Sequence, residues 1–333
     1  MESSNNVLAF DHSMKHLRLV FMGTPEFAVA SLDALVQAGC QIVAVVTAPD
    51  KPAGRGMKIQ QSAVKKYATE QGLKVMQPEK LKNQGFLQEL QSLKPDIQVV
   101  VAFRMLPEVL WNMPPMGTIN LHGSLLPQYR GAAPINWAVI NGERKTGVTT
   151  FKLRQEIDTG DILLQESFPI SQEDTAGDVH ERMKNIGAQL LVQTIKGLAE
   201  GNLRETPQAA WMERLGETAL PLRHAPKITT EICRIDWNRP VDEIQNLIRG
   251  LSPLPGAFTE LHGKVLKIFH SHKEKLRQEE HLGQAYSDGK TFLKFAAADG
   301  YIYADEIQLE GRKKMTTGEF MRGYRFESNG SGT

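Results

Sequence analysis

The sequence predicts an α/β domain with a Rossmann-like, doubly wound parallel sheet, followed by a smaller β-rich domain. Short apolar runs rich in β-branched residues alternate with helical patterns across the first half of the chain, and the pattern changes after about residue 207. Alternating strands and helices are typical of a parallel sheet with helical crossovers. A chain of 333 residues is long enough for two domains, because single domains usually hold about 100 to 200 residues.

The first half of the chain supplies strands and helices in turn. The run "LRLVFMG", residues 17–23, ends in glycine and is followed by Thr-Pro and by apolar residues at helical spacing, which indicates a strand, a turn and a helix. Further strands are expected at 41–50, 74–78 and 96–103, and helices at 62–72 and 85–95. The run "GTINLHG", residues 117–123, has the alternation of a strand.

Prolines and weak periodicity mark residues 207–228 as a connecting segment. A helical pattern and several short strand-like runs with glycine turns follow, as in a small β-barrel or sandwich. The predicted organisation is a flexible extension at 1–16, the α/β domain at 17–206, a linker at 207–228, a β-rich domain at 229–328 and a tail at 329–333.

The composition excludes few functions, but it indicates in which cellular compartment the protein acts. The chain has 39 Lys and Arg against 38 Asp and Glu, a net charge of +1, so no whole-protein field indicates nucleic acid or a membrane surface. Cys40 and Cys233 lie far apart and match no metal or redox spacing. There is no signal-peptide pattern, and no apolar run approaches the roughly 20 residues of a membrane span. A cytoplasmic protein without membrane contact is expected.

Polar residues gather at one strand end. Asn120 and His122 are two apart, so in a strand both side chains point to the same side. In open parallel sheets, ligands sit beyond the carboxyl ends of the strands. On this stretch alone, the two residues could equally be hydrogen-bonded core polar groups.

A carboxylate in the turn "EIDTGDILLQ", Asp158, completes the candidate site. A carboxylate beside an imidazole orients the ring and stabilises its protonated form. Amide, imidazole and carboxylate together suit transfer of an acyl-type group to an amine, since an amide can donate to the developing oxyanion and an imidazole can move protons.

Other site classes fit less well. The turn "GTPEFA" lacks the glycine spacing of a dinucleotide fingerprint. The stretch "HGSLL" is no nucleophile elbow, which argues against a serine hydrolase that uses Ser124. His270 and His272 have no evident third metal ligand, so a solvated strand end is favoured over a metal site.

The block "SLLPQYRGAAPINWAVINGERKTGVT", with Asn120, His122 and Asp158 around it, resembles the folate-dependent formyltransferases. The resemblance runs from about Leu17 to Phe326 and includes "FMGTPEFA", "APDKPAGRGMK", "IDTGDIL" and "RIDWNRPVDEIQNLIRGLSPLPGAF". The "PAGRG" loop is similar to that of the members that act on methionyl-tRNA.

The resemblance implies a reaction and its residues. The formyl group of N10-formyltetrahydrofolate would pass to the amino group of methionine carried by initiator tRNA, with no metal, in a monomer whose C-terminal domain is OB-fold-like and binds tRNA. The implied catalytic residues are Asn120, His122 and Asp158. The implied folate-binding residues are Ser124, Leu125, Leu126 and Pro127, and the implied tRNA-binding residues are Arg55, Lys58 and Lys227. Arg104, in "AFRMLP", stands where many members have a glycine beside the folate.

Two stretches are locally basic. Residues 50–66 and 262–277 each hold five Lys or Arg against one acid: Lys51, Arg55, Lys58, Lys65 and Lys66 against Asp50, and Lys264, Lys267, Lys273, Lys275 and Arg277 against Glu274. Charge alone favours a solvated face, whereas the resemblance favours phosphate contacts. The alternatives are formyl transfer to a sugar-nucleotide amine, hydrolysis of the formyl-folate, and a noncatalytic RNA-binding module.

Overall fold

The computed structural model describes residues 14–53, 58–216, 221–277 and 279–324, and these residues form two compact units. The first unit combines 1–130, 147–167 and 182–223, and the second combines 131–146, 168–181 and 224–333. The units are therefore interleaved along the chain, whereas the predicted domains follow one another in sequence.

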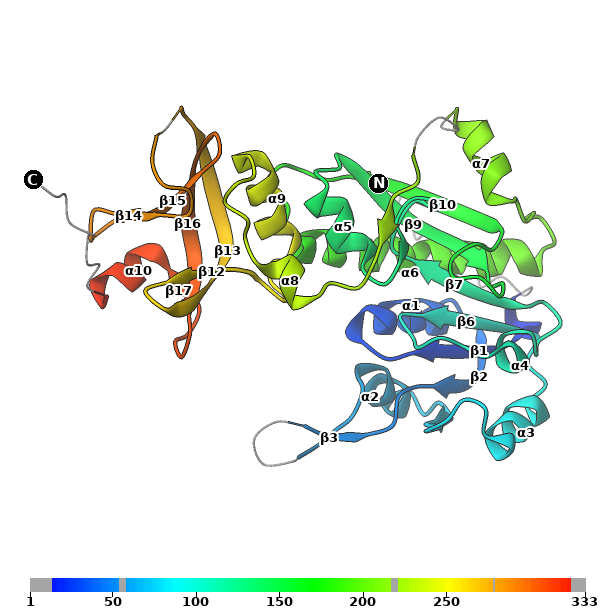
Figure 1. The fold of residues 1–333 in the computed structure, drawn as a ribbon. Coiled ribbons are helices and arrows are strands. Elements are labelled where there is room, and N and C mark those ends of the chain that lie inside the picture. The colour runs from blue at the N-terminus through cyan, green and yellow to red at the C-terminus, as the bar shows by residue number, and fades with distance from the viewer. Residues whose placement is uncertain (1–13, 54–57, 217–220, 278, 325–333) are drawn as a thin grey trace, which may run out of the picture. The chain divides into compact units, whose positions relative to one another are not determined.

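The first unit is built on a seven-stranded sheet, counted over the described residues, in the order β10-β9-β7-β6-β1-β2-β5 (Figure 1). The strands are β1 (Arg18–Gly23), β2 (Gln41–Val46), β5 (Val75–Met76), β6 (Ile97–Val101), β7 (Thr118–His122), β9 (Lys145–Lys152) and β10 (Ile162–Pro169). The helices around them are α1 (Glu26–Gln37), α2 (Ala63–Glu70), α3 (Gln84–Ser92), α4 (Glu108–Trp111), α6 (Ala176–Ala199) and α7 (Gln208–Leu215). A 3-10 turn, η1 (Met14–His16), precedes β1.

Five strands of this sheet confirm the predicted parallel topology. β5, β2, β1, β6 and β7 pair in parallel, and the chain order reverses between β1 and β6. Ligands of doubly wound folds bind at the carboxyl ends of the strands beside such a reversal. β9 was not expected from the sequence; it runs antiparallel to β7 and extends the sheet.

Apolar residues on both faces explain why these strands lie inside the unit. All residues of β6 are buried, as are most of β1. One core forms from residues of β1, β2 and β6 with the inner faces of α3 and α4; its large members include Met22, Phe86, Leu90 and Leu110. Side-chain caps begin two of the helices, where Ser62 and Asn83 accept from the backbone N–H three residues later.

A short hairpin leaves the carboxyl end of β2. β3 (Lys51–Ala53) and β4 (Lys58–Gln60) pair antiparallel. Asp50 fixes the base of this hairpin, because its carboxylate accepts from Lys65 Nζ at 2.5 Å and from Gln77 Nε2 at 2.8 Å. The sequence did not predict this pairing of β3 with β4 or its anchoring by Asp50.

The second unit contains the expected β-rich domain. Its antiparallel strands follow the order β12-β13-β16-β15-β14, with β17 beside β16 (Figure 1). Their bounds are β12 (Ala257–Leu261), β13 (Lys264–Lys275), β14 (Ala285–Ser287), β15 (Leu293–Ala297), β16 (Gly300–Leu309) and β17 (Met315–Thr316). Register shifts near His270 bend β13 against β16, which suits a curled, half-barrel sheet.

The remaining elements of the second unit pack beside this sheet or connect to it. They are β8 (Arg130–Gly131), α5 (Pro134–Ile140), β11 (His224–Ala225), α8 (Thr230–Cys233), α9 (Val241–Gly250) and α10 (Thr317–Arg322). Ile244 and Ile248 of α9 pack into the sheet's apolar core together with Trp237, whose ring stacks on Phe295 at 4.9 Å. Thr316 and Glu319 form a capping box that begins α10.

Candidate active site

Strand β7 positions the amide and the imidazole. Asn120 lies opposite Phe151 of β9, and His122 lies two residues further, at the carboxyl end of the strand. Alternation along the strand places both side chains on one face. His122 is 7% exposed and Asn120 is partly exposed. Within the described residues, the Asn120 side chain has no hydrogen-bond partner, so its amide is available to a ligand.

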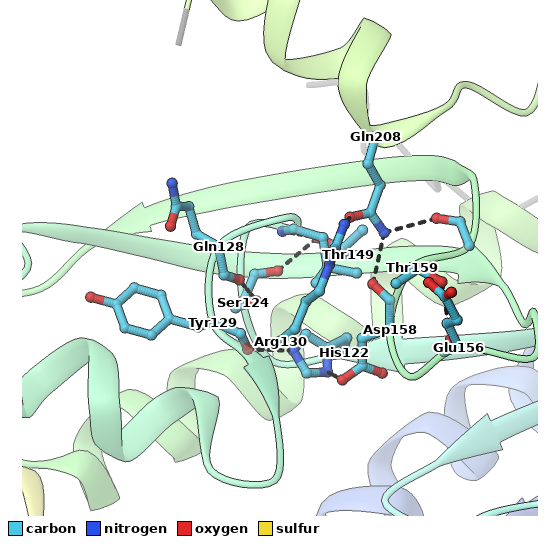
Figure 2. A network of polar contacts seen from close by, with 12 residues as sticks. His122, Ser124, Gln128, Tyr129, Arg130, Thr149, Glu156, Asp158, Thr159 and Gln208 are labelled. Carbon is cyan, nitrogen blue, oxygen red and sulfur yellow. Dashed lines mark hydrogen bonds and ion pairs between the residues drawn. The ribbon is translucent and has the colours of Figure 1, made fainter. Parts of the chain in front are cut away.

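The His122 ring lies between a carboxylate and a carbonyl (Figure 2). Nδ1 is 3.8 Å from Asp158 Oδ2, and Nε2 is 2.9 Å from the backbone oxygen of Tyr129. A carbonyl oxygen can only accept, so Nε2 carries a hydrogen in this arrangement. A proton on Nδ1 would then complete an ion pair with Asp158. The predicted approach of Asp158 to His122 is present.

The turn that carries Asp158 is tightly held. Asp158 has φ 54°, in the left-handed region, which Asp and Asn adopt more readily than most residues. Its backbone oxygen accepts from Gln208 Nε2 at 2.8 Å. Two residues later, Gly160 packs so closely that a Cβ would lie 1.6 Å from the backbone oxygen of Lys152. The sequence "DTG" therefore places its glycine where a side chain cannot fit.

Replacing Gly160 by alanine is expected to lower the free energy of unfolding by at least about 3 kcal/mol, since overpacking against backbone cannot relax by side-chain motion. Urea unfolding of the full-length protein measures the loss. The matched control is Gly318→Ala in α10, where nothing lies within 4 Å of the added carbon and helix propensity favours alanine by up to about 1 kcal/mol. Equal stabilities of the two variants would show that the turn tolerates displacement.

The segment Ser124–Pro127 is held by hydrogen bonds to Gln128, Thr149 and Gln165. The Ser124 hydroxyl is buried and donates to the Gln128 oxygen at 2.6 Å, so it serves a turn. Leu126 is 1% exposed, and its N–H donates to Thr149 Oγ1 at 3.1 Å. Pro127 is also buried, and only Leu125 is partly exposed. Leu125 is therefore the side chain of this segment that is most open to a ligand.

The described residues do not test whether the three expected tRNA residues lie together, because Lys58 and Lys227 belong to different units. Arg55 lies outside the described residues. Lys58 begins β4 of the hairpin, and Lys227 is exposed in the second unit, between β11 and α8.

Ion pairs make both basic stretches less positive than their composition indicates. Lys65 pairs with Asp50, and this hydrogen bond holds the pKa of the Asp50 carboxyl below its ordinary value. In the second unit, Lys273 and Lys275 both pair with Asp242, at 2.6 Å and 2.5 Å. Lys273, followed by Lys275, lowers the pKa of that carboxyl. These three lysines are therefore partly neutralised.

Arg104 binds a neighbouring loop. Its guanidinium donates to the backbone oxygens of Pro78 and Glu79, the latter at 2.9 Å, and lies 5.6 Å from the centre of the Phe103 ring. The arginine thus ties the segment after β6 to the segment after β5, through groups that a glycine lacks.

Gln208 is the site residue that the sequence analysis missed. It lies at the start of α7, inside the predicted linker, and is 6% exposed. It bonds to the Asp158 turn and to Arg130. The pattern of this stretch gave no sign of these contacts; Pro207 directly before a helix was the one local indication of a helix start.

Among the residues that the structure describes, no three His, Cys, Asp or Glu side chains come together as a possible metal site. None of the described helices is long and apolar enough to cross a membrane. Cys40 and Cys233 are both free thiols, and burial raises the pKa of Cys40 to about 11.

Comparison with known proteins identifies both halves of the chain. Residues 17–195 match the formyl transferase family, and residues 227–325 match the formyl transferase C-terminal domain. A methionyl-tRNA formyltransferase of Bacteroides fragilis is 51% identical over 315 residues, which span 92% of this chain and 95% of that protein. One from Porphyromonas gingivalis is 48% identical over 322 residues, spanning 95% and 98%.

A solved structure shares the fold. An N-formyltransferase of Helicobacter canadensis, in complex with folinic acid and dTDP-3-aminofucose, superposes with a TM-score of 0.64 at 22% identity, covering 86% of this chain and 98% of that one. A sequence identity of 22% supports a shared fold and no more than that. The sequence identity to each of the two bacterial relatives is about one half over more than nine-tenths of the chain. This chain therefore belongs to the methionyl-tRNA formyltransferase family.

Proposed function

We propose that this chain transfers the formyl group of N10-formyltetrahydrofolate to the α-amino group of methionine on initiator tRNA, using Asn120, His122 and Asp158. The family membership supports the reaction. The observation that supports this site most strongly is the contact of 3.8 Å between His122 Nδ1 and Asp158 Oδ2 at the carboxyl end of β7. On the same strand, the Asn120 amide has no hydrogen-bond partner among the described residues.

The chemistry requires little activation of the acceptor. A free α-amino group titrates at about 8, so a useful fraction is neutral near pH 7. The amine nitrogen attacks the formyl carbon and the carbonyl oxygen becomes an oxyanion. The new C–N bond then replaces the bond to N10, and the proton lost by the amine ends on the tetrahydrofolate nitrogen. No covalent intermediate with the protein is needed.

Each of the three side chains has a distinct part in this step. The Asn120 amide donates to the oxyanion, which is where preorganised donors contribute most. His122, with Nε2 engaged by Tyr129, has Nδ1 left to hold or pass the proton. Asp158 fixes the ring's orientation and balances the positive charge that the imidazole gains.

The folate is assigned to the segment Ser124–Pro127 and its neighbours. Because the Ser124 hydroxyl already donates to the Gln128 backbone oxygen, we assign folate binding to Leu125 and to the remaining backbone groups of this segment, and we assign no metal to the reaction. The strand order reverses between β1 and β6, and β6 is the neighbour of β7, after which this segment follows. Ligands of doubly wound folds bind beside such a reversal.

The tRNA is assigned to Arg55, Lys58 and Lys227, on the family resemblance. The anchoring of β3 and β4 beside Asp50 supports a role for residues near Lys58, since Asp50 fixes where β3 leaves the sheet. The protein is proposed to act as a cytoplasmic monomer, with catalysis at Asn120, His122 and Asp158 and tRNA binding in residues 229–328.

Replacing Arg55 by leucine is expected to lower formylation of initiator methionyl-tRNA by roughly 10- to 100-fold, the equivalent of about 1–3 kcal/mol for a lost bidentate contact. A guanidinium can stack on and bond an unpaired end of the acceptor stem, while a paired end resists opening. Arg55→Lys should restore only part, because an ammonium keeps the charge but not the planar fork.

The readout is the ratio of activities on initiator tRNA and on a version with a Watson–Crick first pair. Folate binding and melting temperature serve as controls and should not change. If wild type and both variants share one ratio, Arg55 does not read that end.

The function itself is tested by offering one donor and three acceptors. The protein is incubated with N10-formyltetrahydrofolate and charged initiator tRNA, a sugar-nucleotide amine, or water alone. We expect formylmethionyl-tRNA in amounts equal to the tetrahydrofolate released. Formylation of the sugar amine at a higher rate, or release of formate without tRNA, would overturn the proposal.

A further inference from the structure

Helix α7 lies in the segment that composition marks as a linker, yet two of its side chains face the candidate active site. Gln208 and Trp211 are three residues apart and so share one face of the helix. Their polar groups are directed at two different loops of the site, the Asp158 turn and the Ser124–Pro127 segment.

Gln208 uses both ends of its amide (Figure 2). Nε2 donates to the backbone oxygens of Asp158 and Gly160, at 2.8 Å and 2.9 Å. Oε1 accepts from Arg130 Nε at 3.2 Å and from Arg130 Nη2 at 2.5 Å. A side chain that is 6% exposed therefore joins the turn that carries the catalytic carboxylate to the residue that follows Tyr129.

Trp211 reaches the second loop through Gln165. Its Nε1 donates to Gln165 Oε1 at 2.8 Å, and Gln165 Nε2 donates to the Leu126 oxygen at 2.7 Å and to Thr149 Oγ1 at 3.0 Å. The indole also packs against a small buried cluster formed by Leu126, Phe151 and Ile162. Phe151 in turn meets the His122 ring edge to face, with 6.4 Å between ring centres.

These contacts fix the two partners of the His122 ring. Nε2 faces the Tyr129 oxygen, and the neighbouring Arg130 is held by Gln208. Nδ1 faces Asp158, whose left-handed backbone is held at its oxygen by the same amide. A residue in a sparsely populated backbone region persists only where its surroundings hold it there, and Gln208 supplies one such restraint.

We infer that α7 is a positioning element of the active site, in which Gln208 sets the place of Asp158 and Arg130 around His122 and Trp211 sets the place of the Ser124–Pro127 segment. The inference rests on the proposed catalytic role of His122 and Asp158. It gives Gln208 and Trp211 of α7 a positioning role at the active site, in a segment that composition marks as a linker. A displacement of about 1 Å at reacting groups can cost a hundredfold in rate, so loss of these bonds should appear in kcat.

The test uses full-length protein carrying Gln208→Leu, which keeps most of the volume and removes all four bonds. We expect kcat for formylation of initiator methionyl-tRNA to fall about 10- to 100-fold, with KM for folate and for tRNA within threefold of wild type. Trp211→Phe keeps an aromatic ring against the small cluster and removes the indole N–H; a smaller fall in kcat, with the same KM values, is expected. Glu213→Gln, an exposed change on the same helix, is the matched control and should match wild type.

The outcomes separate the possible failures. A kcat within twofold of wild type for Gln208→Leu, or a parallel loss of kcat, folate affinity and melting temperature, would overturn the positioning role. If Gln208→Leu does not fold, Gln208→Glu decides in the same assay, since it keeps an acceptor for Arg130 and loses both donors to the turn. Failure of the proposed function is a different result, because wild-type protein would then form no formylmethionyl-tRNA.

Discussion

Replacing Asn120 by alanine is expected to slow formyl transfer by about 100- to 1,000-fold, the loss typical of one oxyanion donor. The amide has no hydrogen-bond partner among the described residues, so its removal leaves no protein group unpaired and the fold should persist. Rapid-quench single-turnover assays with saturating folate and methionyl-tRNA measure the chemical step without product release. Folate binding should change little, because the contact strengthens only as the oxyanion forms.

The matched control for this variant is Asn112→Ala, an exposed asparagine at the end of α4. It should transfer the formyl group at the wild-type rate. An Asn120→Ala protein that is folded, binds folate and transfers at that same rate would remove Asn120 from the mechanism.

Replacing Asp158 by asparagine is expected to lower the single-turnover rate by about 100- to 10,000-fold, by analogy with the loss of a carboxylate that orients a catalytic histidine. The variant removes charge but little shape. Asparagine tolerates the left-handed backbone of this position, and the bond from Gln208 to the backbone oxygen is kept. The loss should therefore report on the contact with His122 and not on the turn.

A comparison with Asp161→Asn tests that assignment. Asp161 lies three residues further and pairs with Arg154 at 2.5 Å, so its loss should affect stability more than rate. Equal rates for Asp158→Asn and wild type would mean that the 3.8 Å contact with His122 has no part in catalysis.

Much of the fold could be predicted from local pattern. The strands β1, β2, β5, β6 and β7 are short apolar runs between helical patterns, and the burial of β1 and β6 on both faces explains this composition. The meeting of His122 with Asp158 was predicted too, from residue types and from the family resemblance. Strand β9 was missed, because in "KTGVTTFK" three buried threonines replace the apolar residues that mark a strand.

The unpredicted parts depend on contacts between distant residues. Gln208 is 50 residues from Asp158 and 78 from Arg130, and no local pattern records such a pairing. The same holds for the lysines counted as basic surface: Lys273 and Lys275 share Asp242, which is more than 30 residues earlier in the chain. Composition counts charges, whereas the fold decides which of them are already paired.

The most direct test of the account follows the formyl carbon itself through one turnover. Folate labelled in the formyl group is mixed with excess protein and methionyl initiator tRNA, and the label is traced to folate, formate or methionine. The account predicts that wild-type protein moves the label to methionine on the tRNA, while Asn120→Ala holds the labelled folate and transfers it at least about 100-fold more slowly. Label in formate, or transfer to methionine at the wild-type rate by the Asn120→Ala protein, would contradict it.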